Sequence, residues 1–388
     1  MLSAEKNELF TRVGPGTPCG NLLRRYWHPV CPVADLTAQS PHKRVRILGE
    51  DVVVFRHAAG SYSCLAERCA HRGCSLYYGF IEDGGVRCAY HGWKFDAEGR
   101  CIEQPFEPQG STYKDRVRQA AYEVQELAGL LFVYMGPKPA PLLPRWDTCV
   151  RTDGTRKVQI RPTLNCNWLQ CQENAVDTTH TYYLHGHMMK TKGLESASTR
   201  WFYRPILSYD FMQTEWGFEK RIEYGGDQPE DAIWPPAIFP NVLRIPEGPA
   251  ENTHWRVPID DEHTQLFLVS FQPAKPGTTP EPQAEIPVEY FPSDITESGE
   301  YAVDTFFSQD RMAWETQGVI FDRTRENLSV SDRGILMFRK LLEEQIHLVE
   351  RGEDPMGTIR DPAKNVMIAF TKHSYNRLRE PSDEKATV

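Results

Sequence analysis

Two short stretches, Cys69-Ala70-His71-Arg72-Gly73 and Cys88-Ala89-Tyr90-His91-Gly92-Trp93, decide how the first part of this chain folds. Each stretch offers one thiol and one imidazole, so the order along the chain is Cys69, His71, Cys88, His91. A structural zinc site usually pairs like with like, as Cys-x₂₋₄-Cys followed by His-x₃₋₅-His. The alternation of thiol and imidazole therefore indicates a different kind of centre.

The alternating order fits a Rieske [2Fe–2S] cluster. Such a cluster needs two thiolates on one iron and two imidazoles on the other, so each loop must contact both irons. Gly73, two residues after His71, and Gly92, directly after His91, allow the loops to wrap closely around a cluster. We therefore predict a Rieske cluster that accepts single electrons from an external donor, with its ligands in these loops: Cys69, His71, Cys88 and His91.

The residues around these loops favour β-structure. Residues 43–65 read as a small antiparallel meander, with apolar strands on both sides of Gly49-Glu50 and a turn at Ala59-Gly60. A further apolar strand, 130–134, leads into a segment with prolines at positions 137, 139, 141 and 144, which suits a semi-rigid linker. We expect a domain boundary near residue 140, with an N-terminal segment and an all-β Rieske domain over residues 1–140.

The second part of the chain, residues 141–388, reads as a larger α+β domain. Aromatic-rich segments at 201–224 and 252–271 predict antiparallel strands, whereas 304–317 and 332–349 have apolar residues at helical spacing. The proline-rich segment 273–292 reads as a surface loop. The predicted architecture is an antiparallel sheet flanked by helices.

A second group of polar residues lies in this larger domain. Two imidazoles, His180 and His185, lie five residues apart, and the carboxylate of Asp177 lies three residues before the first. Two histidines and one carboxylate form the facial triad of non-haem Fe(II) oxygenases. On a regular helix His185 would be rotated about 140° from His180, so the helix must end or bend between them if both bind one metal ion.

The composition excludes several classes of protein. With 388 residues, 40% of them hydrophobic and 25% charged, the chain is neither disordered nor a coiled coil. A net charge of −9 with no basic block makes nucleic acid an unfavourable partner. The longest apolar run, 127–135, is far shorter than the ~20 residues of a membrane span, and the N-terminus has no signal-peptide pattern. We expect a cytoplasmic protein that does not bind membranes.

The two cluster loops resemble those of the large subunits of Rieske non-haem iron oxygenases. Rieske proteins of respiratory chains carry an extra cysteine in each loop, but here Tyr90 stands opposite Cys74, so that disulfide cannot form. The resemblance covers nearly the whole chain. Segments 12–18, 23–27, 317–324 and 331–334 are similar to the phthalate dioxygenase branch, which also contains aromatic O-demethylases.

The resemblance implies roles for residues of the second domain. The run Asn174-x₂-Asp177-x₂-His180-x₄-His185 matches the mononuclear iron motif of the family, which makes His180 and His185 the expected ligands, with His187 as a competitor for the second place. The segment 308–318 looks like a late helix of the family whose Asp completes the triad. We choose Asp310 as this third ligand, and the alternatives are Glu315 and Asp304.

The same resemblance implies how two centres work together. Family members assemble head-to-tail as trimers, in which Asp177 would bridge the cluster ligand His91 of one subunit and His180 of its neighbour. Asn174 is expected to lie close to the iron as a pocket or support residue. A homotrimer or a multiple of it is therefore expected.

The expected activity is that of a terminal oxygenase acting with O₂ on an aromatic, carboxylated small molecule. Electrons would come from a reductase that carries flavin and a ferredoxin domain. NAD(P)H would be used only indirectly, since no Gly-x-Gly-x-x-Gly fold signature is present. O-demethylation and ring hydroxylation remain equally open, because both use the same iron chemistry. The alternatives are a non-catalytic Rieske electron-transfer protein with an appended binding domain, and a zinc-dependent hydrolase.

The segment after the iron motif offers candidates for a substrate pocket. Residues 187–204 contain Met188, Met189, Trp201 and Phe202, which suit the wall or lid of an apolar pocket. Four cations of this segment are candidates for binding a substrate carboxylate: Lys190, Lys192, Arg200 and Arg204.

Overall fold

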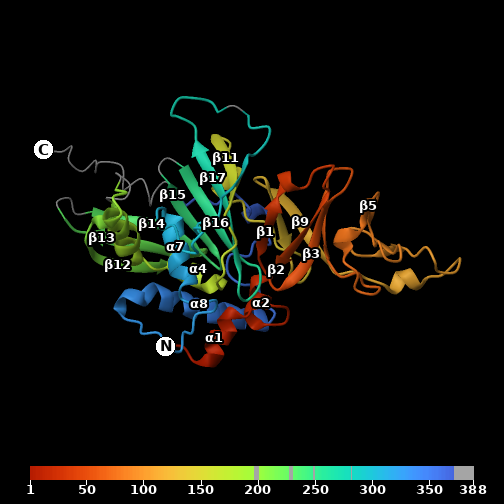
Figure 1. Cartoon of the computed structure of the whole chain (residues 1–388), viewed down its shortest axis with the longest axis horizontal. Coiled ribbons are helices and arrows are strands. Elements are labelled where there is room, and N and C mark those ends of the chain that lie inside the picture. Colours follow the sequence, from red (N-terminus) through yellow and green to blue (C-terminus); the bar gives the residue numbers. More distant parts are fainter. Residues whose placement is uncertain (196–200, 227–229, 248–249, 281, 371–388) are drawn as a thin grey trace.

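The computed structural model describes residues 1–195, 201–226, 230–247, 250–280 and 282–370. The described part of the chain is elongated (Figure 1), with segments from the first third of the sequence at one end and the larger C-terminal part at the other. Within the described ranges, no helix combines the length and the apolar character that crossing a bilayer requires.

A six-stranded antiparallel sheet forms the inner part of the N-terminal domain. Its strands follow the order β1-β10-β9-β4-β3-β2. They are β1 (Trp27–Pro32), β2 (His42–Ile47), β3 (Glu50–Arg56), β4 (Tyr62–Ala66), β9 (Ala121–Leu127) and β10 (Leu130–Tyr134). The meander predicted over residues 43–65 is confirmed as β2, β3 and β4. Gly49 at the first turn has a φ of 75°, a backbone conformation that glycine adopts without strain.

A small four-stranded sheet forms the outer end of the N-terminal domain. It contains β5 (Phe80–Glu82), β6 (Gly85–Arg87), β7 (Lys94–Phe95) and β8 (Cys101–Glu103). This end has its own hydrophobic core, which includes Phe55, Leu76, Trp93 and Phe95 together with Cys69 and Cys88. The two predicted cluster loops are therefore held by a separate small core.

The C-terminal domain is built on an eight-stranded sheet with the order β12-β13-β14-β15-β16-β17-β11-β18. Its strands are β11 (Gly154–Ile160), β12 (Ile206–Gln213), β13 (Gly217–Tyr224), β14 (Glu230–Ile238), β15 (Val242–Glu247), β16 (Ala250–Pro258), β17 (Thr264–Pro273) and β18 (Val288–Tyr290). The strands predicted in 201–224 and 252–271 are confirmed.

The last strand corrects the interpretation of 273–292 as a loop. Val288–Tyr290 pairs with β11, and this is the one parallel pairing within the described sheet. A strand of three residues is too short to show a pattern of alternating polar and apolar residues. Its partner strand β11 is about 130 residues away in the sequence, so no neighbouring turn marks the pairing either.

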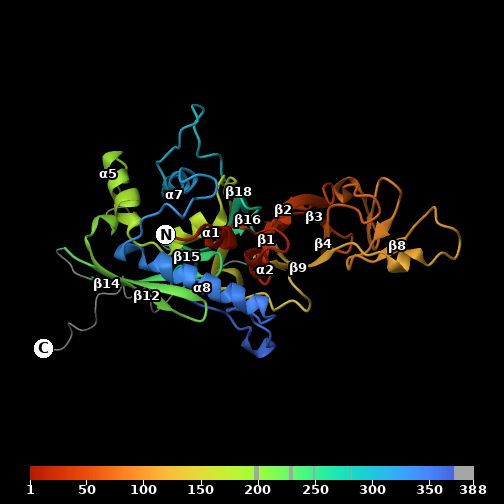
Figure 2. The same cartoon turned by 90° about the horizontal axis from the view of Figure 1, so that it is seen from below.

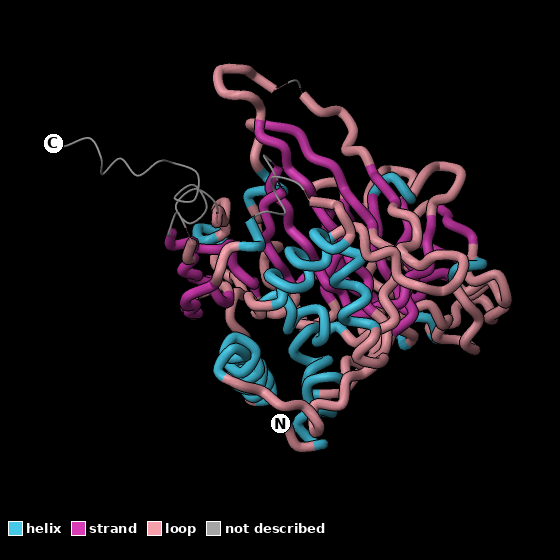
Figure 3. The backbone as a smooth tube through the Cα atoms, turned by 60° about the vertical axis from the view of Figure 1, so that its left-hand side comes forward, coloured by secondary structure: helices cyan, strands magenta, loops and turns pink. Residues whose placement is uncertain are grey.

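The helices gather on one side of the strands (Figure 3). The α-helices among the described residues are α1 (Ala4–Thr11), α2 (Pro18–Leu23), α3 (Asp147–Val150), α4 (Trp168–Ala175), α5 (Met188–Thr191), α7 (Phe306–Glu315) and α8 (Arg333–Glu350). The helices predicted in 304–317 and 332–349 are confirmed as α7 and α8. On α8 the side chains of Phe338, Leu342 and Ile346 are buried at the predicted spacing.

The junction between the two parts is packed rather than extended. The backbone N–H of Leu142 donates to the carbonyl of Ile359 (2.8 Å), so the proline-rich segment lies against the C-terminal region. The N-terminal helices also contact the second domain, through Lys6–Glu343 (2.9 Å) and Arg12–Asp261 (3.2 Å). The boundary near residue 140 stays a prediction.

Candidate metal centres

The segment that carries both predicted histidine ligands forms an unusual helix. α4 starts at the N-cap Asn167, whose side chain accepts from the N–H of Leu169, and it ends at Ala175. After a short turn the chain forms a π-helix, η4 (Thr181–His187), with His180 at its N-cap. Because a π-helix bonds residues i and i+5, His180 and His185 come to one face. The expectation of a helix that ends or bends between them is therefore wrong: the turn widens instead.

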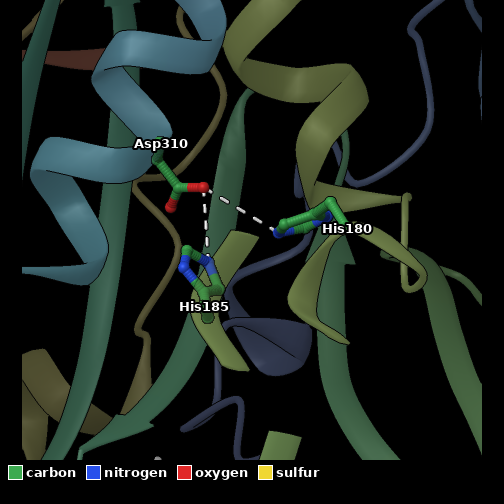
Figure 4. Close-up of side chains that lie close together, drawn as sticks. All are labelled: His180, His185 and Asp310. Atoms are coloured by element: carbon green, nitrogen blue, oxygen red, sulfur yellow. Dashed lines mark ion pairs between the residues drawn. The ribbon is translucent and has the colours of Figure 1, made fainter. Parts of the chain in front are cut away.

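Asp310 reaches the same place from α7. This helix begins with a capping box in which Thr305 and Ser308 bond reciprocally to backbone N–H groups. One oxygen of Asp310, Oδ1, lies 3.4 Å from Nε2 of His185 and 3.8 Å from Nε2 of His180. Figure 4 shows the carboxylate facing both rings. The structure thus brings together one carboxylate and two imidazole nitrogens, all within 4.8 Å of one another.

Asn174, on the last turn of α4, touches two of these three residues. Its side-chain amide nitrogen lies 3.2 Å from Oδ1 of Asp310 and 3.3 Å from Nε2 of His180. The expectation that Asn174 lies beside the triad agrees with this position.

The pKa values of His185 and Asp310 are shifted by their contact with each other. Burial alone would lower the pKa of His185, but the carboxylate of Asp310 and the amide of Gln309 outweigh it and raise this pKa. Burial would raise the pKa of Asp310, but the nearby His185 and His180 lower it. The carboxylate of Asp310, which favours a proton on His185, would equally favour a metal cation between the two imidazoles.

Asp177 contacts His180 from the side opposite to Asp310. Its Oδ2 lies 3.4 Å from Nδ1 of His180, whereas Oδ1 accepts from the backbone N–H (2.8 Å) and hydroxyl (3.0 Å) of Thr179. Burial raises the pKa of Asp177, but His180 and Thr179 together lower it to about 2. The carboxylate is therefore ionised at neutral pH.

The competing residues have other surroundings. His187 is exposed, and its ring lies beside that of Tyr183 at 5.9 Å. Glu315 accepts from Nε of Arg311 (3.0 Å) and from the hydroxyl of Tyr301 (2.8 Å). Asp304 is exposed. The geometry thus favours Asp310 and His185 over these alternatives.

Aromatic side chains line one flank of His185. The ring of Phe306 lies 5.0 Å and that of Phe202 lies 5.6 Å from the imidazole, and the two phenyl rings are 5.3 Å apart. Phe202 belongs to the predicted wall segment, in which Met189 is buried.

The candidate cations of that segment have different environments. Lys190 and Lys192 are exposed, and the guanidinium of Arg204 lies 5.2 Å from the centre of the Tyr224 ring. Arg200 lies outside the described residues, as do residues 196–199 before it. The role of one of these cations as the anchor of a substrate carboxylate stays a prediction.

At the outer end of the molecule the four predicted cluster residues meet in two pairs. The imidazole rings of His71 and His91 lie 4.6 Å apart. Burial, together with the neighbouring thiol of Cys88, raises the pKa of Cys69 to about 12, and burial and Cys88 also raise the pKa of Cys74. The two pairs correspond to the two thiolates and two imidazoles that a Rieske cluster requires.

One ring nitrogen of the imidazole pair is placed as a metal ligand would be. The Nδ1 atom of His91 is buried and has no hydrogen-bond partner among the described residues. A buried polar atom normally finds a partner, so this one fits a nitrogen that binds metal. His71 stacks on Trp93, with ring centres 4.1 Å apart and an interplanar angle of 11°.

Cys74 is a free thiol beside this group, and Tyr90, in the position opposite, places its ring 3.8 Å from that of His91. Three residues near the centres were not assigned roles from the sequence: Trp93, Phe306 and Gln309. Gln309 directly precedes the predicted ligand Asp310, and Trp93 ends the second cluster loop. Their positions in the sequence do not indicate that Gln309 contacts His185 or that Trp93 contacts His71. Only the fold shows these contacts.

Comparison with known proteins is consistent with these two groups of residues. Residues 26–121 match the model of the Rieske [2Fe-2S] domain, and residues 290–375 match the model described as LigXa C-terminal domain like. The chain is 40% identical, over 95% of its length and 86% of the relative, to the 5,5'-dehydrodivanillate O-demethylase oxygenase subunit of Sphingobium sp. strain SYK-6. It is 35% identical, over 89% of its length and 86% of the relative, to the phenoxybenzoate dioxygenase subunit alpha of Ectopseudomonas oleovorans.

A solved structure shares the fold at low sequence identity. The terminal oxygenase of carbazole 1,9a-dioxygenase from Nocardioides aromaticivorans IC177 superposes with a TM-score of 0.63 at 19% identity, covering 88% of this chain and 96% of that one. Its fold is the same small all-β domain joined to a larger domain of antiparallel sheet and helices. Sequence and fold together place this enzyme among the Rieske non-haem iron oxygenases, as an oxygenase subunit.

Proposed function

We propose that this chain is the terminal oxygenase component of a multicomponent enzyme that oxidises an aromatic acid with O₂ and reductase-derived electrons. The observation that carries this proposal is the convergence of His180, His185 and Asp310 from two segments more than 120 residues apart in sequence. A second support is the pairing of thiol with thiol and imidazole with imidazole at the other end of the molecule.

The donor set of the triad fits mononuclear Fe(II). Two neutral imidazoles and one carboxylate on one side of a metal ion leave positions for other ligands. His180, His185 and Asp310 would hold the ion, and Cys69, His71, Cys88 and His91 would hold the cluster. When bound, the two groups supply single-electron transfer and the activation of O₂.

Asn174 and Asp177 would assist from within the protein. The amide of Asn174 donates to Oδ1 of Asp310 and so orients the carboxylate toward the imidazoles. Asp177 orients His180 through its other ring nitrogen, as outer carboxylates commonly do for metal-bound histidines.

The arrangement of the two centres supports the proposed homotrimer. The small sheet β5–β8, which adjoins the cluster loops, lies at one end of the chain: Figure 1 shows β5 there with α7 in the other half, and Figure 2 shows β8 there with α5 and α7 in the other half. Electrons therefore have a long way to travel within one chain. A head-to-tail neighbour would bring its His91 to Asp177, and we propose this contact as the route between centres.

The aromatic substrate is supported by the phenyl rings beside the triad and by the relatives. Phe202 and Phe306 offer an apolar flank on which a planar ring would pack. The similar O-demethylase and dioxygenase subunits bear the names of methoxylated or phenoxylated aromatic acids. Demethylation and ring hydroxylation differ only in which carbon faces the metal. A flavin and ferredoxin-type reductase and a cytoplasmic location stay predictions.

Product analysis tests the proposed reaction. Purified enzyme, a generic reductase and NADH would be incubated in air with methoxylated and carboxylated aromatics, and products would be identified by mass. Release of formaldehyde indicates demethylation, and a cis-diol indicates ring dioxygenation. If no aromatic acid of the panel is converted or stimulates NADH oxidation, the proposed substrate class is wrong.

Metal analysis separates the proposal from its alternatives. The oxygenase predicts about three iron atoms per chain, two in the cluster and one at the triad. A Rieske electron carrier with a binding domain predicts about two, and a zinc hydrolase predicts zinc without the visible absorption of an iron–sulfur cluster.

A further inference from the structure

Gln309 lies directly before Asp310 on α7 and is completely buried. Its side-chain oxygen Oε1 lies 2.9 Å from Nδ1 of His185. Its side-chain nitrogen Nε2 donates to the backbone carbonyl of Val303 at 3.2 Å. Both polar atoms of the amide are therefore used, one of them on a residue of the triad.

The carbonyl of Val303 fixes which way the amide points. A carbonyl oxygen only accepts hydrogen bonds, so the NH₂ group of Gln309 must face Val303. The amide oxygen then faces His185, and because this oxygen is also only an acceptor, Nδ1 of His185 must carry a proton. A neutral imidazole with its proton on Nδ1 has its lone pair on Nε2.

The lone pair so defined faces the middle of the triad. Nε2 of His185 is the atom that lies 3.4 Å from Oδ1 of Asp310. We propose that Gln309 is a positioning residue that fixes the tautomer and ring orientation of His185, so that Nε2 is presented to a divalent metal. This inference rests on the proposed function, in which His185 is a ligand.

The two imidazoles of the triad differ in their outer partners. Nδ1 of His180 faces the anionic carboxylate of Asp177, whereas Nδ1 of His185 faces the neutral amide of Gln309. Outer partners of a metal-bound histidine set both its orientation and its basicity. The neutral amide orients His185 without adding a further negative charge to those of Asp310 and Asp177.

The test compares three variants with the natural enzyme. Gln309→Leu removes both hydrogen bonds at similar volume, and Gln309→Glu keeps an acceptor for Nδ1 of His185. Gln317→Leu is the matched control, because Gln317 is exposed just past the C-terminus of α7 and its side-chain nitrogen donates to the backbone carbonyl of Ala313, away from the triad.

Binding of Fe(II) alone is measured without turnover. Each protein is depleted of mononuclear metal by a chelator, with its Rieske absorption retained, and is titrated anaerobically with Fe(II). We expect Gln309→Leu to weaken Fe(II) binding about 10- to 100-fold, Gln309→Glu to retain or strengthen it, and Gln317→Leu to leave it unchanged. Nitric oxide is then added to the Fe(II)-loaded proteins, and the electron paramagnetic resonance signal of the adduct is recorded. We expect this signal to broaden or shift only in Gln309→Leu.

The outcomes distinguish this inference from the proposed function. If the natural enzyme itself binds no Fe(II) at the triad, the proposed function fails. If the natural enzyme binds Fe(II) and Gln309→Leu binds it equally well with the same spectrum, the role of Gln309 is refuted. Equal loss in Gln309→Leu and Gln309→Glu would also refute it, because that pattern reports packing rather than an acceptor for His185. Should Gln309→Leu fail to fold, Gln309→Met replaces it in the same comparison.

Discussion

The carboxylate of Asp177 divides its two oxygens between two partners: Oδ1 is held by Thr179, and Oδ2 lies 3.4 Å from Nδ1 of His180. The bonds from Thr179 come from a residue only two positions away, so the orientation of Asp177 is fixed locally. His180 therefore meets a preset anionic partner on the side away from Asp310.

We predict that Asp177→Asn slows electron transfer between the two centres by about tenfold or more, because the amide is neutral and presents a donor in place of an acceptor. The oxidation of the reduced cluster would be followed by stopped-flow absorption in single turnover with substrate and O₂. Both iron contents should persist. An unchanged rate would reject Asp177 as the bridge.

Replacement of Asp310 should separate the two metal centres. Asp310→Ala removes one of the three ligands of the mononuclear metal, while the Rieske absorption should remain. Loss of a residue that only supports a ligand lowers metal affinity or activity about 10- to 100-fold, so loss of the ligand itself should lower mononuclear iron content and activity by more than that. The control is Glu315→Gln, which alters a carboxylate of the same helix that pairs with Arg311. Full mononuclear iron in Asp310→Ala would show that another residue is the third ligand.

Glu173 supports the end of α4 that carries Asn174. Its carboxylate is almost completely buried and accepts from Arg323 (2.8 Å) and Arg339 (2.6 Å). Glu173→Gln leaves buried guanidinium charge without a full counter-charge and should lower the free energy of unfolding by about 3–5 kcal/mol.

The control for Glu173→Gln is Glu343→Gln, which breaks the exposed pair with Lys6 and should cost only about 0–1 kcal/mol. Both are measured by urea denaturation followed by tryptophan fluorescence. Equal effects in the two variants would contradict the distinction between buried and exposed pairs.

Trp93 should protect the cluster. Its indole is 8% exposed and covers one face of His71. Trp93→Ala removes this stacking, worth about 0.5–1.5 kcal/mol, and part of the small core, so the visible absorption should decay faster on warming. Trp93→Phe keeps an aromatic face and should decay at an intermediate rate. Identical decay in Trp93→Ala and the natural enzyme would show that the stack has no such role.

The buried His28 should make stability depend on pH. Burial lowers its pKa to about 4, and the hydrogen bond to the carbonyl of Leu23 opposes this shift only in part. Between pH 6.5 and 4 the unfolded chain protonates this histidine while the folded protein does not, so stability falls as the pH falls. The loss from this group amounts to roughly 3 kcal/mol over that window.

Thermal unfolding midpoints measured from pH 7 to pH 4 check this dependence, with His28→Gln as the comparison. In His28→Gln the unfolding midpoint should fall less steeply as the pH is lowered. The pH dependence that remains would come in part from His254, because burial lowers its pKa to about 3. A slope as steep as that of the natural enzyme would assign the acid sensitivity to other groups.

The local sequence was sufficient for features that depend on residue identity and short spacing. The alternation of Cys69, His71, Cys88 and His91 predicts the pairing of like ligands, because one thiol and one imidazole in each short loop let that loop contribute to both irons. The meander of β2, β3 and β4 and the helices α7 and α8 followed from periods of two and 3.6 residues.

The tertiary structure decided what spacing leaves open. His180 and His185 share a face only because the chain forms a π-helix there, and the 3.6-residue period gave the wrong rotation. Asp310 faces them, and Gln309 bonds His185, because α7 packs beside η4, although more than 120 residues separate these segments in the chain. The sequence by itself determined which chemical groups this protein has available. Packing between distant segments determined which of these groups meet, because contacts across such separations depend on the whole fold and leave no periodic trace in the sequence.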